Sequence, residues 1–373
     1  MTKEEIYAII KKTKLSESFV GIADKIFEEK RVSAEEGLLL YEKGDIAFLG
    51  MLANWINSKK NRNCVYYNKN IHIEPTNYCV NKCKFCSYRK NPGEPGFWDY
   101  SISEILEIIS QHYAKNITEV HIVGGVHPER DLFYYADLLK QIKTNFPNLF
   151  IKAFTAVELF FMIEKAGLAL FDGLVILKQS GLDSIPGGGA EIFSKKIRTK
   201  ICDEKASAEQ WLEVHKTAHL AGIPSNATML YGHIEAYEHR IDHLLQLRNL
   251  QDETKGFQAF IPLKYRNRNN ELSHLKETTL IEDLKNIAVS RVFLDNFQHV
   301  KAYWPMLGKD ATEIALSFGI DDIDGTIEDT TKIYTMAGAE ETKPVLSIEE
   351  IKYMVEKAGK RAIERNTIYG VVV

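Results

Sequence analysis

The chain has little of what marks several large classes of protein. No apolar stretch in its 373 residues approaches the roughly 20 residues that a helix needs to cross a bilayer. The first five residues, Met1 to Glu5, lack the apolar core of a signal peptide. A net charge of −4 provides no global positive field. With no internal repeat, low-complexity tract or proline-rich linker either, the sequence predicts neither a membrane nor a nucleic acid partner.

Cysteine is also scarce. Five cysteines in a chain this long do not make a disulfide framework, so we expect a reducing, cytoplasmic location. Three of the five nevertheless fall together in the run Cys79-Val80-Asn81-Lys82-Cys83-Lys84-Phe85-Cys86. Three thiolates at this spacing can wrap one corner of a four-iron cluster, which usually takes four cysteines. Because no fourth cysteine follows, one iron is left open to a small-molecule ligand, as one position is on a catalytic zinc ion.

Two other kinds of metal site compete with this interpretation. The run could belong to a structural zinc site or to a ferredoxin-type electron carrier, each with a distant fourth ligand. Zinc sites usually pair their cysteines as CxxC, twice over. The two remaining cysteines, Cys64 and Cys202, are far apart and each stands alone. We expect both to be unligated thiols, and we expect no second cysteine-ligated cluster.

The order of predicted elements indicates an α/β protein. Residues 1–70 read as a helical extension, with capping boxes at Thr2…Glu5 and Ser33…Glu36. Short apolar strands then alternate with amphipathic helices. The expected strands cover residues 71–75, 119–123, 151–154, 181–185, 225–230, 258–262, 300–304 and 322–324. Eight such strands favour a closed (β/α)8 barrel of the TIM type over residues 71–340. Residues 341–373 are expected to add a C-terminal helix packed on the barrel, over 347–365.

The barrel places the unusual loops at one end. In this fold the active site lies at the C-terminal ends of the strands. The cysteine run follows the first expected strand, Gly124-Gly125 the second and Pro186-Gly187-Gly188-Gly189 the fourth. Tyr231-Gly232-His233 follows the fifth. All four loops therefore converge on the same mouth, which is stronger evidence for a site than any one motif.

The CxxxCxxC run, with an aromatic residue before its last cysteine, resembles the signature of the radical S-adenosylmethionine (SAM) enzymes. The resemblance implies a 4Fe–4S cluster held by Cys79, Cys83 and Cys86, with SAM on the open iron. A Gly-Gly pair after the second strand meets the amino group of SAM in that family. Glu191 can accept hydrogen bonds from ribose hydroxyls, and Arg198 can pair with the SAM carboxylate. The expected SAM-binding residues are Phe85, Gly124, Gly125, Gly188, Glu191, Arg198, Asn226 and Thr228.

Residues 71–340 resemble the aminofutalosine synthase family more specifically. The matching stretches include His72-Ile-Glu-Pro-Thr-Asn-Tyr-Cys79, Glu119-Val-His-Ile-Val-Gly-Gly125, Ser184-Ile-Pro-Gly-Gly-Gly-Ala-Glu-Ile-Phe193, Asn226-Ala-Thr-Met-Leu-Tyr-Gly-His-Ile-Glu235, Gly256-Phe-Gln-Ala-Phe-Ile-Pro-Leu263, His299-Val-Lys-Ala-Tyr-Trp304 and Asp321-Asp-Ile-Asp-Gly-Thr326. The dehypoxanthine futalosine cyclases of the same pathway to menaquinone share the Pro-Gly-Gly-Gly-Ala-Glu loop and are the alternative within the superfamily.

The resemblance implies a reaction. A reduced cluster passes one electron to SAM, giving methionine and a 5′-deoxyadenosyl radical. The radical adds to the enol-ether double bond of 3-[(1-carboxyvinyl)oxy]benzoate, the aryl group migrates from oxygen to carbon, and carboxylate is lost. The product is 6-amino-6-deoxyfutalosine, and SAM is consumed as a co-substrate. An electron donor such as flavodoxin or ferredoxin is implied as a partner, whereas the sequence says nothing about oligomeric state.

The two carboxylates of that substrate need partners, because unpaired carboxylates are costly to desolvate. From charge and position we expect them among His127, His233, Arg291, Lys301 and Arg266. The expected catalytic residues are His127, His233, Tyr231 and Arg291. Gln258 is a further candidate wall residue, and Lys264 and Arg268 flank Arg266 in a basic loop. The pairs His215/His219 and His239/His243 lie four residues apart, but without a HExxH pattern we expect ordinary core or surface histidines.

Overall fold

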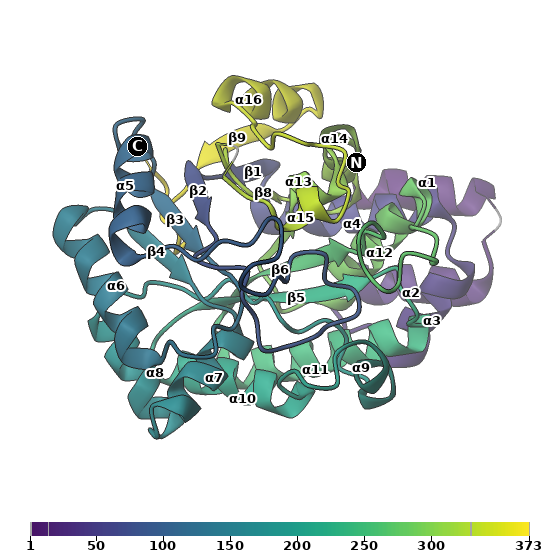
Figure 1. Cartoon of the computed structure of the whole chain (residues 1–373). Coiled ribbons are helices and arrows are strands. Elements are labelled where there is room, and N and C mark those ends of the chain that lie inside the picture. Colours follow the sequence, from purple (N-terminus) through teal and green to yellow (C-terminus); the bar gives the residue numbers. More distant parts are fainter. Residues whose placement is uncertain (1, 14, 329, 373) are drawn as a thin grey trace.

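A ring of parallel strands forms the centre of the computed structural model, which describes residues 2–13, 15–328 and 330–372 (Figure 1). The strands are β1 (Cys64–Tyr67), β2 (Asn70–Ile73), β3 (Glu119–Ile122), β4 (Phe150–Ala153), β5 (Ser225–Tyr231), β6 (Phe257–Lys264), β7 (His299–Ala302), β8 (Asp322–Ile323) and β9 (Arg361–Glu364). All pairings between these strands are parallel, as a βα alternation requires.

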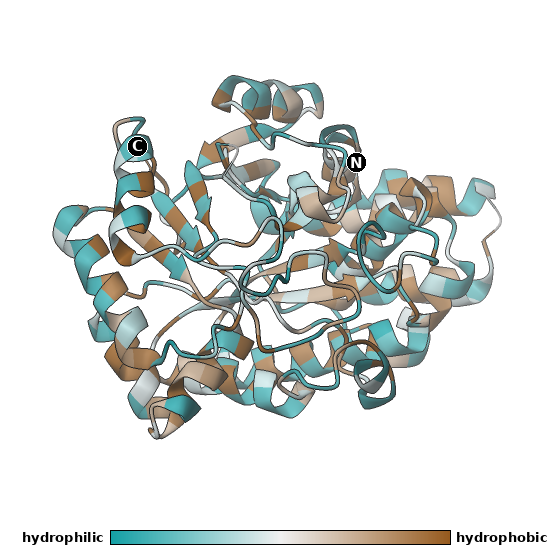
Figure 2. Cartoon of the chain, in the orientation of Figure 1, coloured by the Kyte–Doolittle hydropathy of each residue, from teal (hydrophilic) through white to brown (hydrophobic). Residues whose placement is uncertain are grey.

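Helices connect the strands and cover the ring on the outside. They are α1 (Lys3–Thr13), α2 (Glu17–Phe27), α3 (Ala34–Lys43), α4 (Ile46–Asn61), α5 (Ile102–Tyr113), α6 (Leu132–Asn145), α7 (Ala156–Lys165), α8 (Leu170–Gln179), α9 (Lys195–Ile201), α10 (Ala208–Leu220), α11 (Tyr237–Thr254), α12 (Leu280–Phe293), α13 (Trp304–Leu307), α14 (Lys309–Ala315), α15 (Ile333–Met336) and α16 (Ile348–Lys357), with a 3-10 turn η1 (Leu316–Phe318). Their apolar residues lie mainly on the faces toward the strands (Figure 2), as Ile105 and Ile109 do on α5.

Isolated bridges close the ring between its two sheets. One sheet has the order β2-β3-β4 and the other the order β5-β6-β7-β8-β1-β9. Lys152 of β4 bridges Ser184, Ile185 bridges Ser225 of β5, and Ile327 bridges Ile71 of β2. The eight positions of the predicted barrel are therefore all present, and their C-terminal ends point to one mouth.

At the fourth barrel position the structure differs from the prediction. A strand was expected over 181–185, but only Ser184 and Ile185 make ladder contacts. Gly181 has a φ of +115°, outside the extended region. The side chain of Asp183 then accepts a hydrogen bond from the Ile151 amide at 2.7 Å, where a strand would offer a main-chain carbonyl.

Both ends of the chain contribute a strand where helix was expected. β1 lies inside the predicted helical extension, where Val65, Tyr66 and Tyr67 favour extended backbone. The predicted C-terminal helix over 347–365 ends at Lys357, and β9 follows it. β9 pairs with β1 in register Cys64 to Arg361. The helices of the extension themselves are present, with both predicted capping boxes, and α4 and α3 pack against α12 and α11. The three-segment division of the chain stays a prediction.

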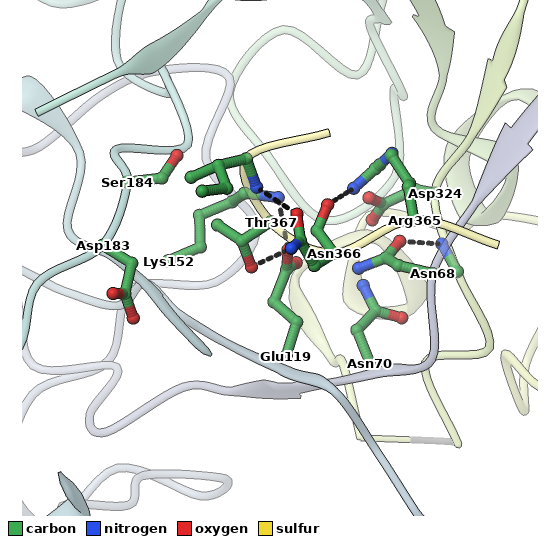
Figure 3. A network of polar contacts seen from close by, with 12 residues as sticks. Asn68, Asn70, Glu119, Lys152, Asp183, Ser184, Asp324, Arg365, Asn366 and Thr367 are labelled. Carbon is green, nitrogen blue, oxygen red and sulfur yellow. Dashed lines mark hydrogen bonds and ion pairs between the residues drawn. The ribbon is translucent and has the colours of Figure 1, made fainter. Parts of the chain in front are cut away.

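An ion-paired layer, which we call the floor, lies inside the barrel below the mouth, and Arg365 joins it from the segment after β9. The floor consists of Glu119, Lys152, Lys301, Asp322, Asp324 and Arg365. Arg365 donates two hydrogen bonds to the Asp322 carboxylate, at 2.5 and 3.0 Å. Thr367 donates to Glu119 at 2.7 Å, and Lys152 reaches the same carboxylate at 2.8 Å (Figure 3). All six floor residues are buried.

Candidate functional site

The three predicted cluster ligands lie in the long loop between β2 and α5. The sulfur of Cys79 accepts a hydrogen bond from the Val126 amide at 3.3 Å, and its carbonyl accepts one from Arg89 at 2.9 Å. The Cys86 amide donates to the Cys83 carbonyl at 3.0 Å. These contacts fold the cysteine loop against the loop that follows β3, so the two predicted motifs meet at the mouth.

Glycine is needed where these two loops touch. A Cβ on Gly125 would lie 2.3 Å from the Tyr78 carbonyl oxygen, which is backbone and cannot rotate away. The Gly125 amide donates to the Thr76 carbonyl at 2.7 Å. The Gly124 amide donates to the buried Glu158 carboxylate at 3.1 Å. The Gly-Gly pair is therefore held tightly, with Gly124 lining the cavity described below.

The three thiols suit a multi-iron cluster better than a single zinc ion. Burial raises the pKa of Cys79 and of Cys83, so binding a metal must displace their protons. Zinc binds thiolates at about 2.3 Å, which brings their sulfurs within about 4 Å of one another. Among the described residues, the group of three potential ligands that does converge within 4.8 Å is His72, His121 and Asp324, not the cysteines.

A cavity of about 250 Å³ opens at the C-terminal ends of the barrel strands, beside Cys86. Residues predicted from the sequence form much of its lining: Phe85, Cys86, Gly124, Gly188, Glu191, Asn226, Thr228, Lys264, Arg266 and Lys301. The segment 331–337 crosses the mouth and adds Thr331, Ile333, Tyr334 and Ala337. The structure thus brings part of the predicted cluster, SAM and substrate residues to one space, while their individual roles stay predictions.

The glycine-rich loop packs directly on β5. Gly187 has a φ of +84°, and a Cβ there would lie 2.1 Å from the Asn226 carbonyl oxygen. Thr228 donates its hydroxyl proton to the Gly187 carbonyl at 2.7 Å. The side-chain Oδ1 of Asn226 is buried without a hydrogen-bond partner. Because such an atom needs a donor, the site fits the amino group or ribose hydroxyls of SAM.

Glu191 connects this loop to the cysteine motif. Its carboxylate forms an ion pair with Lys205, whose ammonium lies 5.6 Å from the centre of the Phe85 ring. Burial lowers the pKa of the Lys205 ammonium, but the Glu191 carboxylate and the thiols of Cys83 and Cys202 together raise that pKa by more. Glu191 also has a φ of +50°, a left-handed conformation that costs about 1 kcal/mol or more in a non-glycine residue. Such local strain is typical of ligand-binding loops.

Arg198 does not line the cavity, so the structure does not place it for the expected pairing with the SAM carboxylate. The buried guanidinium donates to the carbonyls of Ala190, at 2.6 Å, and of Ala206. Arg198 therefore fixes the glycine-rich loop from behind. Its position on a short basic helix, α9, gave no indication that main-chain carbonyls would occupy its donors.

Arg291 lies at the wrong end of the barrel for the role expected of it. It is fully buried on α12, where it forms an ion pair with Asp321 and donates to the Gly319 carbonyl at 3.0 Å. Asp321 precedes β8 and also contacts His299, the first residue of β7. Arg291 therefore binds the N-terminal ends of two strands together, away from the mouth.

His127 lies at the mouth but faces away from the cavity. Its Nδ1 accepts hydrogen bonds from the Glu129 and Arg130 amides, at 3.1 and 3.2 Å, and its Nε2 lies 3.3 Å from Asp99. Burial lowers its pKa. The imidazole is thus occupied on both sides by the turn it stabilises, and the expectation of a catalytic contact is not supported.

His233 and Tyr231 are also occupied by structure. His233 accepts a hydrogen bond from the Ile234 amide at 2.7 Å, and its Nε2 lies 3.2 Å from the Leu230 carbonyl. Tyr231 is fully buried and donates to Asp283 at 3.0 Å. None of the four predicted catalytic residues therefore lines the cavity. They lie in loops, on a helix or at the end of β5, and the sequence does not show which way a side chain turns there.

The remaining candidates have ordinary contacts. His215 and His219 both contact the Ser225 hydroxyl at 2.8 Å. Gln258 accepts a hydrogen bond from Ser184 at 3.3 Å and lies outside the cavity lining. Other such contacts involve Lys264 with Asp283, Arg268 with Ala337, His239 with Ala236, His243 with Thr228, and Cys64 with Arg361. Cys202 lines a shallow hollow beside Cys83.

Sequence analysis missed a row of polar residues inside the barrel. His72, His121 and Lys152 are in register on β2, β3 and β4, and all three line the cavity with Tyr303 and Asp324. Burial lowers the pKa of His121 well below its ordinary value, which keeps the imidazole neutral. The signal was available, because polar residues in the middle of buried strands need a partner.

Comparison with known proteins gives two family matches along the chain. The model described as the radical SAM superfamily matches residues 73–247, and the model described as the CofH/MqnC C-terminal region matches residues 254–372. In solved structures, the chain resembles methylornithine synthase (PylB) with a TM-score of 0.74 and 16% identity, covering 91% of this chain and 97% of that one. It resembles the hydrogenase maturase HydG of Carboxydothermus hydrogenoformans with a TM-score of 0.74 and 14% identity, covering 98% and 84%. These likenesses support the α/β barrel.

Curated relatives are more similar in sequence. The chain is 43% identical to the aminodeoxyfutalosine synthase of Thermus thermophilus, covering 94% of this chain and 95% of that protein. It is 39% identical to the synthase of Streptomyces coelicolor, covering 94% and 93%. It is also 38% identical to the 5-amino-6-(D-ribitylamino)uracil–L-tyrosine 4-hydroxyphenyl transferase of Methanocaldococcus jannaschii, covering 93% and 98%. The predicted resemblance to the aminofutalosine synthases is confirmed. No described helix has the length and apolar character needed to cross a membrane.

Proposed function

The chain belongs to the radical SAM superfamily, with a CofH/MqnC-type C-terminal region, and on this premise we propose that it is an aminodeoxyfutalosine synthase. In the proposed reaction, SAM and 3-[(1-carboxyvinyl)oxy]benzoate give 6-amino-6-deoxyfutalosine through radical addition, aryl migration and loss of carboxylate. The observation that carries the proposal is one cavity that is lined both by the SAM-binding loops and by cationic side chains, including Lys301 and Arg266.

Cys79, Cys83 and Cys86 would hold the 4Fe–4S cluster that this superfamily uses. When bound, the cluster supplies the electron that cleaves SAM into methionine and a 5′-deoxyadenosyl group with an unpaired electron. Asn226 and Glu191 offer acceptor oxygens to SAM from β5 and from the glycine-rich loop. The Gly124 and Gly188 backbones, without side chains, let SAM approach closely.

Lys301 and Arg266 are the proposed partners of the two substrate carboxylates. Lys301 is buried on β7, with its ammonium 3.3 Å from Asp324 and 3.6 Å from Asp322. Arg266 lies after β6, where it donates to the Met306 carbonyl at 3.0 Å and to Glu277 at 2.8 Å. The two cations thus come from different strands and are fixed by neighbours. Fixed charges of this kind orient an anion without reorganising when it binds.

The segment over the mouth excludes water from the reacting groups. Tyr334 and Ile333, both half-buried, line the cavity from α15, and burial raises the pKa of the Tyr334 hydroxyl. A carbon-centred radical needs such shielding because it abstracts hydrogen from accessible groups. The aromatic ring of Tyr303 continues this wall on the β7 side.

The relatives also suggest a second candidate reaction. The transferase of Methanocaldococcus jannaschii is named for 5-amino-6-(D-ribitylamino)uracil and L-tyrosine, neither of which carries two carboxylates. The cationic side chains that line the cavity, Lys301 and Arg266 among them, favour a substrate with carboxylates. Within the futalosine pathway, the cyclase reaction is the other alternative.

The electron donor is proposed to be a small redox protein such as flavodoxin or ferredoxin.

One experiment separates these reactions. The cluster is reconstituted anaerobically, and the enzyme receives SAM, a strong reductant and one candidate substrate in each reaction. Mass spectrometry then identifies the product. Aminodeoxyfutalosine from the enol-ether benzoate supports the proposal. 5′-Deoxyadenosine with that substrate unchanged, or a product from the uracil and tyrosine or from dehypoxanthine futalosine, would replace it. An intact cluster with no SAM cleavage would favour an electron carrier.

A further inference from the structure

Three potential metal ligands converge at the bottom of the cavity. One ligand atom each from His72, His121 and Asp324 lies within 4.8 Å of the others. The strand register causes this, since His72 and His121 are direct neighbours on β2 and β3. The bridge from Ile327 to Ile71 brings the segment after β8 alongside β2, and with it Asp324.

Two of these atoms make no hydrogen bond in the fold. His121 Nε2 is buried without a partner, and the buried Asp324 Oδ2 has His72 Nε2 as an ion-pair neighbour. Leaving a buried polar atom unpaired costs about 1–3 kcal/mol, so such atoms call for an unseen ligand. His72 Nε2 lies 3.3 Å from Asp324 Oδ2, a separation typical of two atoms on the same metal ion.

The outer contacts of the cluster orient it in the way that metal sites require. The other ring nitrogen of His72, Nδ1, lies 3.4 Å from the Tyr303 hydroxyl. The other carboxylate oxygen of Asp324, Oδ1, lies 3.3 Å from the Lys301 ammonium. Metal-binding histidines and carboxylates usually have such second contacts, which fix the ligand atoms toward the ion.

We propose that His72, His121 and Asp324 bind one divalent transition-metal ion, separate from the cysteine-bound cluster. Two imidazoles and one carboxylate suit Zn²⁺, Fe²⁺ or Mn²⁺ and leave further positions open. All three residues line the cavity, so an open position faces it. An oxygen atom of a small-molecule ligand, such as a carboxylate, would complete the coordination there.

The charges around the site favour an anionic ligand on the ion. Three ion pairs make the floor neutral by count: Lys152 with Glu119, Arg365 with Asp322, and Lys301 with Asp324. A divalent ion adds two positive charges to this layer, which a carboxylate from the cavity would offset. Ion binding itself depends only on the three protein ligands and is independent of the proposed function.

Manganese binding to the holoenzyme tests the site directly. Mn²⁺ is titrated anaerobically into enzyme that carries SAM and the oxidised, EPR-silent cluster, and the free ion is counted from its EPR signal. We expect saturable binding of about one ion per chain. Zn²⁺ should displace the Mn²⁺, because N/O sites bind zinc more tightly. His121→Ala removes a ligand whose Nε2 has no partner in the fold, and should weaken Mn²⁺ binding at least about tenfold.

Matched variants exclude other origins of the signal. Cys83→Ala, which disrupts the cluster, and His112→Ala, on the outside of α5, should keep Mn²⁺ binding. Asp324→Asn should weaken it as His121→Ala does, with folding checked by circular dichroism. Absence of saturable binding, or full binding by His121→Ala, would overturn the proposal and leave a buried His–Asp pair. The product assay tests the function separately, so either proposal can fail alone.

Discussion

At the residue scale, Glu191 is the side chain that links the glycine-rich loop, the cavity and Lys205. Glu191→Gln keeps the shape but removes the charge, so the acceptor offered to a ribose hydroxyl is weakened. A hydrogen bond to a charged group contributes about 1.5–3 kcal/mol, which corresponds to an expected loss of SAM affinity of about tenfold to a hundredfold. Calorimetric titration of the holoenzyme with SAM measures it.

The control for this variant lies in the same segment of chain. Glu204 is exposed and stands next to Lys205 in sequence. Glu204→Gln changes the net charge equally, so it should leave SAM affinity unaltered. Equal losses in both variants would show that net charge, and not the Glu191 contact, determines binding.

A second prediction concerns the contact between the cysteine and glycine loops. Gly125→Ala places a Cβ 2.3 Å from the Tyr78 carbonyl, so one of the two loops must move. Displacement near 1 Å at a reacting site costs on the order of 100-fold in rate, and we expect SAM cleavage to fall accordingly. Gly21→Ala, on exposed α2 with no atom within 4 Å of the added methyl, is the matched control and should cleave SAM normally. Normal cleavage by both variants would argue against a tight contact.

Single residues were predictable from the sequence when spacing alone determined their role. The cysteines and Gly125 belong to fixed patterns along one loop, and the structure places both loops together. Arg198, Arg291 and His127 were chosen by charge and approximate position. Their side chains turn toward main-chain groups or a carboxylate that come from distant segments, which a sequence does not display.

At the scale of elements, His243 on α11 ties the glycine-rich segment to β5. Its Nε2 donates to the Thr228 carbonyl at 2.9 Å, and its Nδ1 accepts from the Phe193 amide at 3.2 Å. Burial lowers its pKa from 6.5 to about 3. Below pH 6.5 this histidine binds a proton in the unfolded chain but not in the folded one. Its contribution to the free energy of unfolding is therefore complete above pH 6.5 and is lost progressively toward pH 3.

The corresponding variant is His243→Gln, which does not titrate. Between pH 7 and pH 5 the wild type should lose about 2 kcal/mol of unfolding free energy through this histidine. The variant should be less stable at pH 7 but should lose about that much less on acidification. Urea unfolding at both pH values measures the difference. Parallel pH dependence in the two proteins would show that His243 does not control acid sensitivity.

The sequence predicted strands and helices correctly where an apolar pattern was long and had clear limits. Seven of the eight expected barrel strands appear within a few residues of their predicted limits. The segment 181–185 fails because Asp183 and Gly181 replace ladder geometry with a side-chain contact. β1 and β9 were missed because they lie outside the βα alternation and pair with each other over a separation of almost 300 residues.

At the scale of the whole molecule, the C-terminal segment completes the barrel. Arg365 is fully buried against Asp322, and removing one partner of such a pair typically costs about 3–5 kcal/mol. Arg365→Met should therefore lower the melting temperature markedly and weaken SAM cleavage through a loosened floor. Arg361→Met, at the exposed start of β9, should leave the melting temperature nearly unchanged. Thermal unfolding of the two variants measures this, and equal melting temperatures would contradict it.

The barrel as a whole could be predicted, whereas its polar interior could not. Alternating strands and helices indicate the fold, and strand ends indicate the mouth. The floor joins residues from β3, β4, β7, β8 and the C-terminus, so its ion pairs depend on which strands become neighbours. The row of His72, His121 and Lys152 arises from register in the same way.

The most direct test of the account follows the carbon that SAM contributes. SAM carrying two deuterium atoms at C5′ is given to the reduced holoenzyme with 3-[(1-carboxyvinyl)oxy]benzoate. The masses of the products are then measured by mass spectrometry. If the cavity brings C5′ of SAM against the enol-ether double bond, aminodeoxyfutalosine should carry both deuterium atoms. If the deuterium instead appears only in 5′-deoxyadenosine, the radical abstracts hydrogen, and the proposed addition is wrong.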